Sequence, residues 1–227
     1  MARLARIVIP GIAHHVTQRG NRRGTVFWGD DDYAAYLDLV KEAAIQVGSE
    51  IWAYCLMPNH VHMIVVPRDE QGLRGLFADA HRQYTRRINA RNKWTGHLWQ
   101  GRFGSVAMDE AHLVNAIRYV SLNPVRAGLV KKAEDWPWSS VRAHLGLEHN
   151  TLVKVDPVQQ RMPDFSGQLI VGEHEEMWDR LRKAETTGRP IGHKAWLEQM
   201  ENRTGRALRP KKRGRKRDHA DKSKLSP

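Results

Sequence analysis

Cysteine is almost missing from this sequence of 227 residues, since Cys55 is the only one. A single thiol excludes an intrachain disulfide framework and a cysteine-rich zinc site. Long apolar runs are missing too, because nothing approaches the roughly 18 uninterrupted apolar residues of a membrane span. The basic N-terminus, MARLARIVIPG, has too short an apolar stretch for a signal peptide. These absences predict a cytoplasmic protein with no membrane partner.

Acidic residues are the second shortage. The chain has 25 Asp and Glu against 37 Lys and Arg, a formal net charge of +12 at pH 7. Such an excess favours a polyanionic partner, and nucleic acid before a membrane surface. The hydrophobic content of 41% is enough for a folded core. The length suits one ordinary domain with an appendage, or two small domains.

Residues 1–148 contain the regular patterns. We expect strands at 12–18, 50–57, 60–66 and 105–108, and helices at 30–47, 73–92 and 110–123, with a short final helix within 134–146. The third helix should end at Asn123, because Pro124 disfavours helical geometry in the residue before it. The spacing does not suit a doubly wound sheet. It predicts an α+β fold, a ferredoxin-like antiparallel sheet with helices packed on it.

The apolar pattern weakens in the rest of the chain. Residues 149–204 contain two modest helix candidates, EEMWDRLRKAE and HKAWLEQMENRTG, and form either a small domain or an extension that wraps the first one. Residues 205–227 form a low-complexity basic tail, which we expect to be disordered without DNA. The predicted organisation is therefore a domain at 1–148, a helical extension at 149–204 and a tail at 205–227.

Two histidines interrupt an apolar strand in CLMPNHVHMIVV. Side chains alternate along a strand, so His60 and His62 share one face, at the end where the Pro58-Asn59 turn emerges. Imidazoles at positions i and i+2 can reach one divalent ion. From this pair alone, a hydrogen-bonded histidine pair in the core is the better interpretation.

The third predicted helix offers possible partners for the two histidines. Tyr119 and Asn123 are four residues apart and so project from one helical face. An amide oxygen is a ligand type that suits Mg²⁺ or Mn²⁺, and a phenol beside a metal-polarised phosphodiester can act as a nucleophile. Spacing alone favours a core tyrosine and a helix C-cap asparagine. Tyr84 is a rival nucleophile, but its place on the inward stripe of its own helix favours a core role.

Taken together, five motifs occur in an order that points to one family. MPNHVHMIVV resembles the histidine-hydrophobic-histidine signature of HUH single-strand DNA endonucleases, and YVSLNPVRAGLV resembles the REP-associated tyrosine transposases, a branch of the single-tyrosine, IS200-like transposases. HVTQRGNRR, LWQGRF and WPWSS are also similar to that family. The resemblance covers about residues 8–147.

This resemblance implies a mechanism and a set of roles. It makes His60 and His62 metal ligands and Tyr119 the nucleophile, which forms a 5′-phosphotyrosine link and leaves a free 3′-OH. Asn123 matches the position of a third ligand, which is glutamine in many relatives outside this branch. The cofactor would be Mg²⁺ or Mn²⁺ and the substrate single-stranded DNA next to a hairpin from a repetitive palindrome. Mobile-element relatives are dimers that share active sites, whereas this branch favours a monomer over a homodimer, associated with the nucleoid.

Basic residues in four regions are candidates for DNA contacts. They are Arg19, Arg22 and Arg23 in a loop, Arg82, Arg86 and Arg87 on one helical face, Arg102 in the loop segment LWQGRF, and Lys211, Lys212, Arg213, Arg215, Lys216 and Arg217 in the tail. The tail segment KKRGRKR resembles a minor-groove hook. Trp94, Trp99 and Phe103 would either stack on unpaired bases or belong to the core.

Two other functions fit the same residues. A non-catalytic regulator that binds structured DNA would bind hairpins regardless of chelators. A nuclease that activates water would cleave without a protein–DNA adduct. The complete set of His60, His62, Tyr119 and Asn123 favours the tyrosine enzyme, because a pure binder needs no phenol facing a metal.

Overall fold

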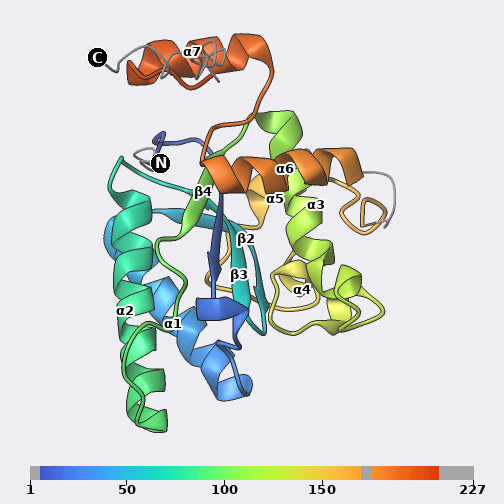
Figure 1. The fold of residues 1–227 in the computed structure, drawn as a ribbon. Coiled ribbons are helices and arrows are strands. Elements are labelled where there is room, and N and C mark those ends of the chain that lie inside the picture. The colour runs from blue at the N-terminus through green and yellow to red at the C-terminus, as the bar shows by residue number, and fades with distance from the viewer. Residues whose placement is uncertain (1–5, 170–174, 210–227) are drawn as a thin grey trace, which may run out of the picture.

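A single four-stranded sheet organises the protein in the computed structural model, which describes residues 6–169 and 175–209. All neighbouring strands are antiparallel, in the order β2-β3-β1-β4. The strands are β1 (His14–Arg19), β2 (Glu50–Met57), β3 (His60–Val66) and β4 (Gly104–Ala107). Helix α1 (Asp30–Val47) joins β1 to β2, and α2 (Gly72–Asn92) joins β3 to β4. This is the ferredoxin-like α+β arrangement that the sequence predicts (Figure 1).

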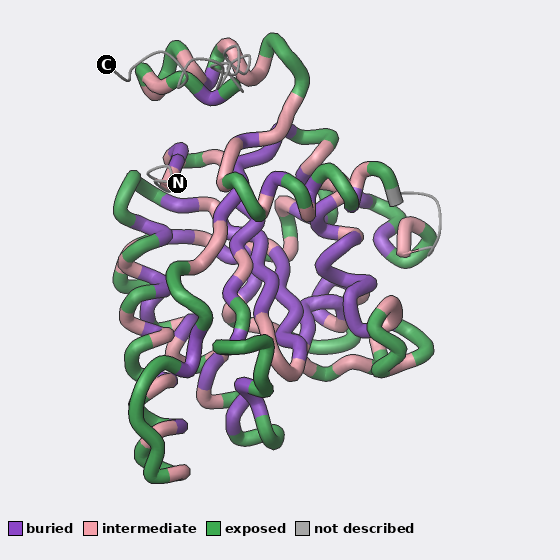
Figure 2. The backbone as a smooth tube through the Cα atoms, in the orientation of Figure 1, coloured by how far each residue is buried: buried purple, intermediate pink, exposed green. Residues whose placement is uncertain are grey.

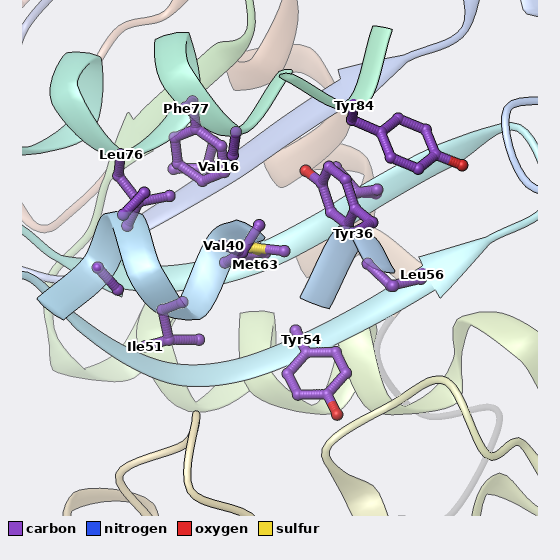
Figure 3. Close-up of a cluster of buried hydrophobic side chains, with 14 of the residues drawn as sticks. Val16, Tyr36, Val40, Ile51, Tyr54, Leu56, Met63, Leu76, Phe77 and Tyr84 are labelled. Carbon is purple, nitrogen blue, oxygen red and sulfur yellow. The ribbon is translucent and has the colours of Figure 1, made fainter. Parts of the chain in front are cut away.

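Helices α1 and α2 cover one face of the sheet. Tyr36 and Val40 of α1 and Phe77 of α2 pack with Val16 and Met63 in a shared apolar cluster (Figure 3). Burial of these large side chains is the main force that holds the two helices on the sheet.

Tyr84 belongs to this same cluster, so it does not face a functional site. Its side chain is fully buried, and its hydroxyl donates a hydrogen bond to the carbonyl oxygen of Val26 at 2.6 Å. The predicted core role of Tyr84 is therefore confirmed.

The opposite face of the sheet is covered by α3 (Glu110–Arg126) and α6 (Glu175–Thr187). Strand β3 shows the two-sided burial that the sequence predicts. Val61, Met63 and Val65 pack toward α1 and α2, whereas Ile64 packs in the cluster of α3. Figure 2 shows the resulting buried centre of the molecule along the sheet. His60 and His62 alternate along the strand with Val61, Met63 and Val65, so they lie on the other face of the sheet, toward α3.

The predicted end of the third helix is wrong. Helix α3 continues through Pro124 to Arg126. Proline lacks an N–H and its ring crowds the carbonyl four residues earlier. The next turn is nevertheless kept, because the Ala127 N–H donates to the carbonyl oxygen of Asn123 at 2.9 Å. Burial of Asn123 and Pro124 against the core outweighs the local preference. Asn123 therefore lies inside the helix, so its interpretation as a C-cap is also wrong.

The remaining elements are short. They are η1 (Asn21–Arg23), η2 (Ala133–Asp135), α4 (Val141–His144), α5 (Asp156–Arg161) and α7 (Lys194–Thr204). The single helix expected within 134–146 is instead split into η2 and α4 around Pro137. Trp136 does pack back on the core, and its indole N–H donates a hydrogen bond to the Leu56 carbonyl oxygen at 3.0 Å. Helices α6 and α7 match the two candidates in the extension. Within the described ranges, none of the helices has the length and apolar content needed to cross a membrane.

Candidate active site on the α3 face of the sheet

His60 and His62 begin strand β3 and point toward α3. Their ring centroids are 4.8 Å apart. His62 is almost completely buried, and His60 is partly buried. The Nδ1 atom of His60 lies 2.6 Å from the side-chain oxygen of Asn59, which can only accept, so His60 carries its proton on Nδ1. The Nε2 atom of His60 is then an open lone pair that can bind a cation.

A third histidine, His15 of β1, joins the pair. Thr17 is opposite His62 and His15 is opposite Ile64 in the β1–β3 register, so the two histidines are diagonal neighbours on one face. The Nε2 atom of His15 lies 2.9 Å from Nδ1 of His62. Burial lowers the pKa of His15 to about 3 and, with positive charge nearby, lowers the pKa of His62 well below its usual value. Both rings are therefore neutral at pH 7, as metal-ligating imidazoles must be.

Tyr119 of α3 lies directly beside these rings. Its ring centroid is 5.5 Å from that of His62 and 5.9 Å from that of His15. Asn123 follows one turn later and is buried, and the Nδ2 end of its amide has no hydrogen-bond partner among the described residues. Rotating the amide of Asn123 by half a turn would put its oxygen where Nδ2 now lies. Tyr119 thus meets His62 within one chain, and Asn123 lies one turn farther along the same helical face.

Helix α6 covers this group from the C-terminal part of the chain. Trp178, Arg182 and Glu185 are spaced by four and three residues, which puts them on one face of the helix. The ring of Trp178 lies 6.0 Å from that of Tyr119, and Glu185 Oε1 lies 3.3 Å from His15 Nδ1. Figure 1 shows α6 lying across α3 and the sheet.

Sequence reasoning missed His15, Trp178, Arg182 and Glu185. The spacing of Trp178, Arg182 and Glu185 predicts that they share one face of a helix, but nothing in the sequence says which surface of the protein that helix covers.

The charges around Tyr119 oppose one another. Burial and the Glu185 carboxylate raise the pKa of Tyr119, while Arg126, Arg182 and a hydrogen bond with Arg182 lower it. The guanidinium carbon of Arg126 lies 5.4 Å from the centre of the Tyr119 ring. The first two effects dominate, so the phenol is protonated at rest and needs a further positive charge to become a nucleophile.

The chemistry of these donors fits a divalent cation. The Nε2 atom of His62 is buried and has no hydrogen-bond partner in the described part of the chain. One ligand atom each from His15, His62 and Glu185 lies within 4.8 Å of the others, a spacing that one ion can bridge. Of the other two predicted ligands, His60 lies beside His62, and Asn123 has an amide Nδ2 without a hydrogen-bond partner among the described residues. Whether the ligand set is His60, His62 and Asn123 stays a prediction.

The predicted DNA-contacting residues are distributed over several surfaces. Arg19 and Arg102 line a cleft of about 370 Å³ that also contains Glu185. Arg82 and Arg86 line a second cleft of about 480 Å³ with Trp99, and Arg87 is exposed nearby. Arg22 and Arg23 are exposed in η1, both with positive φ. The tail residues Lys211, Lys212, Arg213, Arg215, Lys216 and Arg217 lie outside the described residues. Of the three aromatics, Trp94 is exposed and Trp99 is buried, while Phe103 packs at the edge of the core.

Comparison with known proteins identifies the family. The profile of the IS200-like transposases matches residues 9–123, just over half of the chain. The chain belongs to the IS200-like transposase family. Its match includes β1, β3 and the part of α3 that carries Tyr119 and Asn123. The family domain therefore contains every predicted catalytic and metal-binding residue.

Individual relatives point to one branch of the IS200-like family. The chain is 29% identical over 102 residues to a putative REP-associated tyrosine transposase of Haemophilus influenzae, a match of 40% of this chain and 58% of that protein. It is 29% identical over 92 residues to the REP-associated tyrosine transposase of Escherichia coli, covering 40% of this chain and 53% of that protein. This transposase chain thus spans somewhat more than half the length of those two relatives.

A solved structure shares the fold of this IS200-like transposase. It is a REP-associated tyrosine transposase bound to a REP hairpin, with a TM-score of 0.56 and 21% identity. The likeness covers 68% of this chain and 98% of the other. The predicted resemblance to REP-associated tyrosine transposases is thus confirmed in both sequence and fold.

Proposed function

We propose that this transposase is a metal-dependent, site-specific single-strand DNA endonuclease and strand transferase that acts through a 5′-phosphotyrosine intermediate. The observation that supports this most directly is the position of Tyr119, whose ring lies beside that of His62. A phenol next to unpaired imidazole nitrogens is the arrangement that tyrosine-based phosphodiester cleavage requires. Because both residues belong to one chain, the site needs no second copy, which supports the proposed monomer.

The reaction follows from the residues around the phenol. Tyr119 Oη attacks the scissile phosphorus, the P–O3′ bond breaks, and the 3′ oxygen leaves as a hydroxyl after taking up a proton. Arg126 and Arg182 favour the phenolate, since each lowers the pKa of Tyr119. Attack by a 3′-OH on the phosphotyrosine reverses these steps and joins strands, which restores the tyrosine.

A divalent cation would complete the site. His60, His62 and Asn123 would hold Mg²⁺ or Mn²⁺, which would supply charge neutralisation at the scissile phosphate. The two imidazoles come from β3, an inner strand of the sheet, which fixes their position relative to Tyr119. Loss of either imidazole should abolish cleavage.

The proposed DNA is a hairpin with an adjacent single strand. Arg19 and Arg102 line a cleft that extends to Glu185 and so reaches the site. This cleft suits the single strand that contains the scissile phosphate. The cleft along α2 with Arg82, Arg86 and Trp99 suits a phosphate backbone with a nearby base. The basic tail would add affinity largely without sequence preference.

A suicide oligonucleotide tests this proposal. A hairpin with a nicked single-strand extension should trap wild-type protein as a covalent adduct that survives denaturation, and EDTA should prevent it. Tyr119→Phe should form no adduct, whereas the matched variant Tyr84→Phe should form it normally. An undiminished adduct with Tyr119→Phe would exclude Tyr119 as the nucleophile, and cleavage without any adduct would indicate a water-activating nuclease.

One observation favours the alternative of a non-catalytic regulator. Tyr119 is only 6% exposed, with Trp178 of α6 against its ring. A pure binder would bind hairpins equally well with EDTA or with His60→Ala and would never form an adduct. The adduct assay therefore separates the two functions.

A further inference from the structure

One glutamate and two histidines, Glu185, His15 and His62, form a line of side chains that ends at the proposed metal site. Glu185 Oε1 lies 3.3 Å from His15 Nδ1, and His15 Nε2 lies 2.9 Å from His62 Nδ1. The far nitrogen of His62, Nε2, is buried without a partner among the described residues. The line thus runs from helix α6 through β1 to β3, and its last atom is an open donor position.

The number of protons on this line is limited. A neutral imidazole carries one proton, so one ring nitrogen donates and the other accepts. If His62 Nε2 is to bind a cation through its lone pair, the His62 proton must be on Nδ1. That N–H can then only donate to His15 Nε2, which must accept. The His15 proton is consequently on Nδ1 and faces Glu185.

At the Glu185 end of the line, the two facing atoms are both unpaired in the described part of the chain, and the charges of Arg19 and Arg182 act on the carboxyl group. Neither His15 Nδ1 nor Glu185 Oε1 makes another hydrogen bond within the described ranges, although the two are not yet well aligned with each other. Both atoms are buried, so leaving them unpaired would be costly. Hydrogen bonds in a functional site are often poorly aligned until its ligand is bound.

We propose that His15 is a positioning residue that fixes the tautomer and ring orientation of His62, and that Glu185 holds His15 in the matching tautomer. The proposal rests on the proposed function, because it takes His62 as a metal ligand. It gives α6 a specific role, since the residue that completes the line comes from the C-terminal extension. Outer partners of this type typically change metal affinity 10- to 100-fold when they are removed.

A direct role for His15 as a third imidazole ligand is the main alternative. The same three residues lie within 4.8 Å of one another. However, at 2.9 Å the two facing nitrogens are at hydrogen-bond distance, and two lone pairs would repel there without a cation between them. The metal-free protein therefore distinguishes the two arrangements.

Nitrogen NMR of the metal-free protein, with ¹⁵N-labelled histidine at pH 8.5, is the first test. We expect both His15 and His62 as Nδ1–H tautomers, which is the less common form of free imidazole. Glu185→Leu should redistribute the tautomers of His15, because its acceptor is lost. An Nε2–H tautomer at His62 would overturn the proposal, and an unchanged His15 in Glu185→Leu would remove Glu185 from the line.

Binding of Mn²⁺ in the absence of DNA is the second test. His15→Leu should weaken binding roughly 10- to 100-fold, and His15→Gln should restore most of it, because the amide oxygen can accept from His62 Nδ1. His81→Gln, a histidine on the opposite face of the sheet, is the matched control and should bind normally. Unchanged affinity in His15→Leu would refute the positioning role.

Electron spin echo spectra of bound Mn²⁺ separate the remaining cases. Two coordinated imidazoles support His60 and His62 as ligands with His15 behind them, whereas three would make His15 a ligand and overturn the proposal. If His62→Ala also binds Mn²⁺ normally, the proposed metal site itself fails. That result is distinct from a failure of His15 alone.

Discussion

Replacement of Trp178 by alanine tests whether α6 is firmly packed over the site. Trp178 is 1% exposed and is among the largest fully buried side chains. It contacts Tyr119, and the guanidinium carbon of Arg126 lies 4.5 Å from its ring centroid. If Trp178 anchors α6, its loss should release the helix that supplies Arg182 and Glu185.

The magnitude follows from the buried area. A buried tryptophan removes about 200 Å² from water, which at about 25 cal/mol per Å² corresponds to about 5 kcal/mol. Measured costs of Trp→Ala changes in cores are about 3–5 kcal/mol. For a chain of this size each kcal/mol corresponds to about 2–4 °C in Tm, so we expect a decrease of roughly 10 °C.

Thermal unfolding and amide hydrogen exchange measure the effect. The Tm of Trp178→Ala should fall by the stated amount, and exchange should accelerate in α6 more than in α2. Trp94→Ala is the matched control, because Trp94 is 51% exposed and its loss should change stability by less than about 0.5 kcal/mol. If the two variants are indistinguishable, α6 is not held by Trp178 and its coverage of Tyr119 is not a stable feature.

Three further predictions concern the ion pair between Asp32 and Arg91, the loop that carries Arg22 and Arg23, and the contacts with DNA. Burial would raise the pKa of Asp32, but hydrogen bonds from Arg91 and a backbone N–H outweigh it and lower the pKa below 3.8. Asp32→Asn should therefore cost about 2 kcal/mol in the free energy of unfolding at pH 7. In urea titrations the difference from wild type should begin to shrink near pH 3.8 and disappear only as the pH falls through the lowered pKa of the folded state. In Gly20→Ala the added Cβ would lie 2.7 Å from a Val26 methyl group and against a backbone carbonyl, so the substitution should distort η1. We expect weaker hairpin binding in a gel-shift assay. Normal binding would contradict a role for that loop. Arg86→Gln should reduce the salt dependence of hairpin binding by about one phosphate contact, whereas Arg161→Gln, whose guanidinium is held by a glutamate, should leave the slope unchanged.

Local patterns determined much of the fold. Alternation in 60–66 and helical spacing in 30–47 depend on neighbouring residues alone, so the structure reproduces those elements within a residue or two. There are two exceptions. At Pro124 a purely local preference was overruled by burial, and the helix expected within 134–146 is split around Pro137. Weak patterns in 149–169 gave no signal for α5, because a six-residue helix has too few turns to show a period.

The sequence by itself placed His60 with His62 on one face of a strand and Tyr119 with Asn123 on one face of a helix. Spacing alone favoured structural roles for all four, and it was the resemblance of the motifs to a family that made them candidates for the site. Only the tertiary structure brought the two pairs together, and only it added His15 and Glu185. Those two residues are 170 positions apart, and they meet because β1 pairs with β3 while α6 packs over the same face. Such contacts depend on which surfaces bury each other, and a spacing rule within one element cannot specify that.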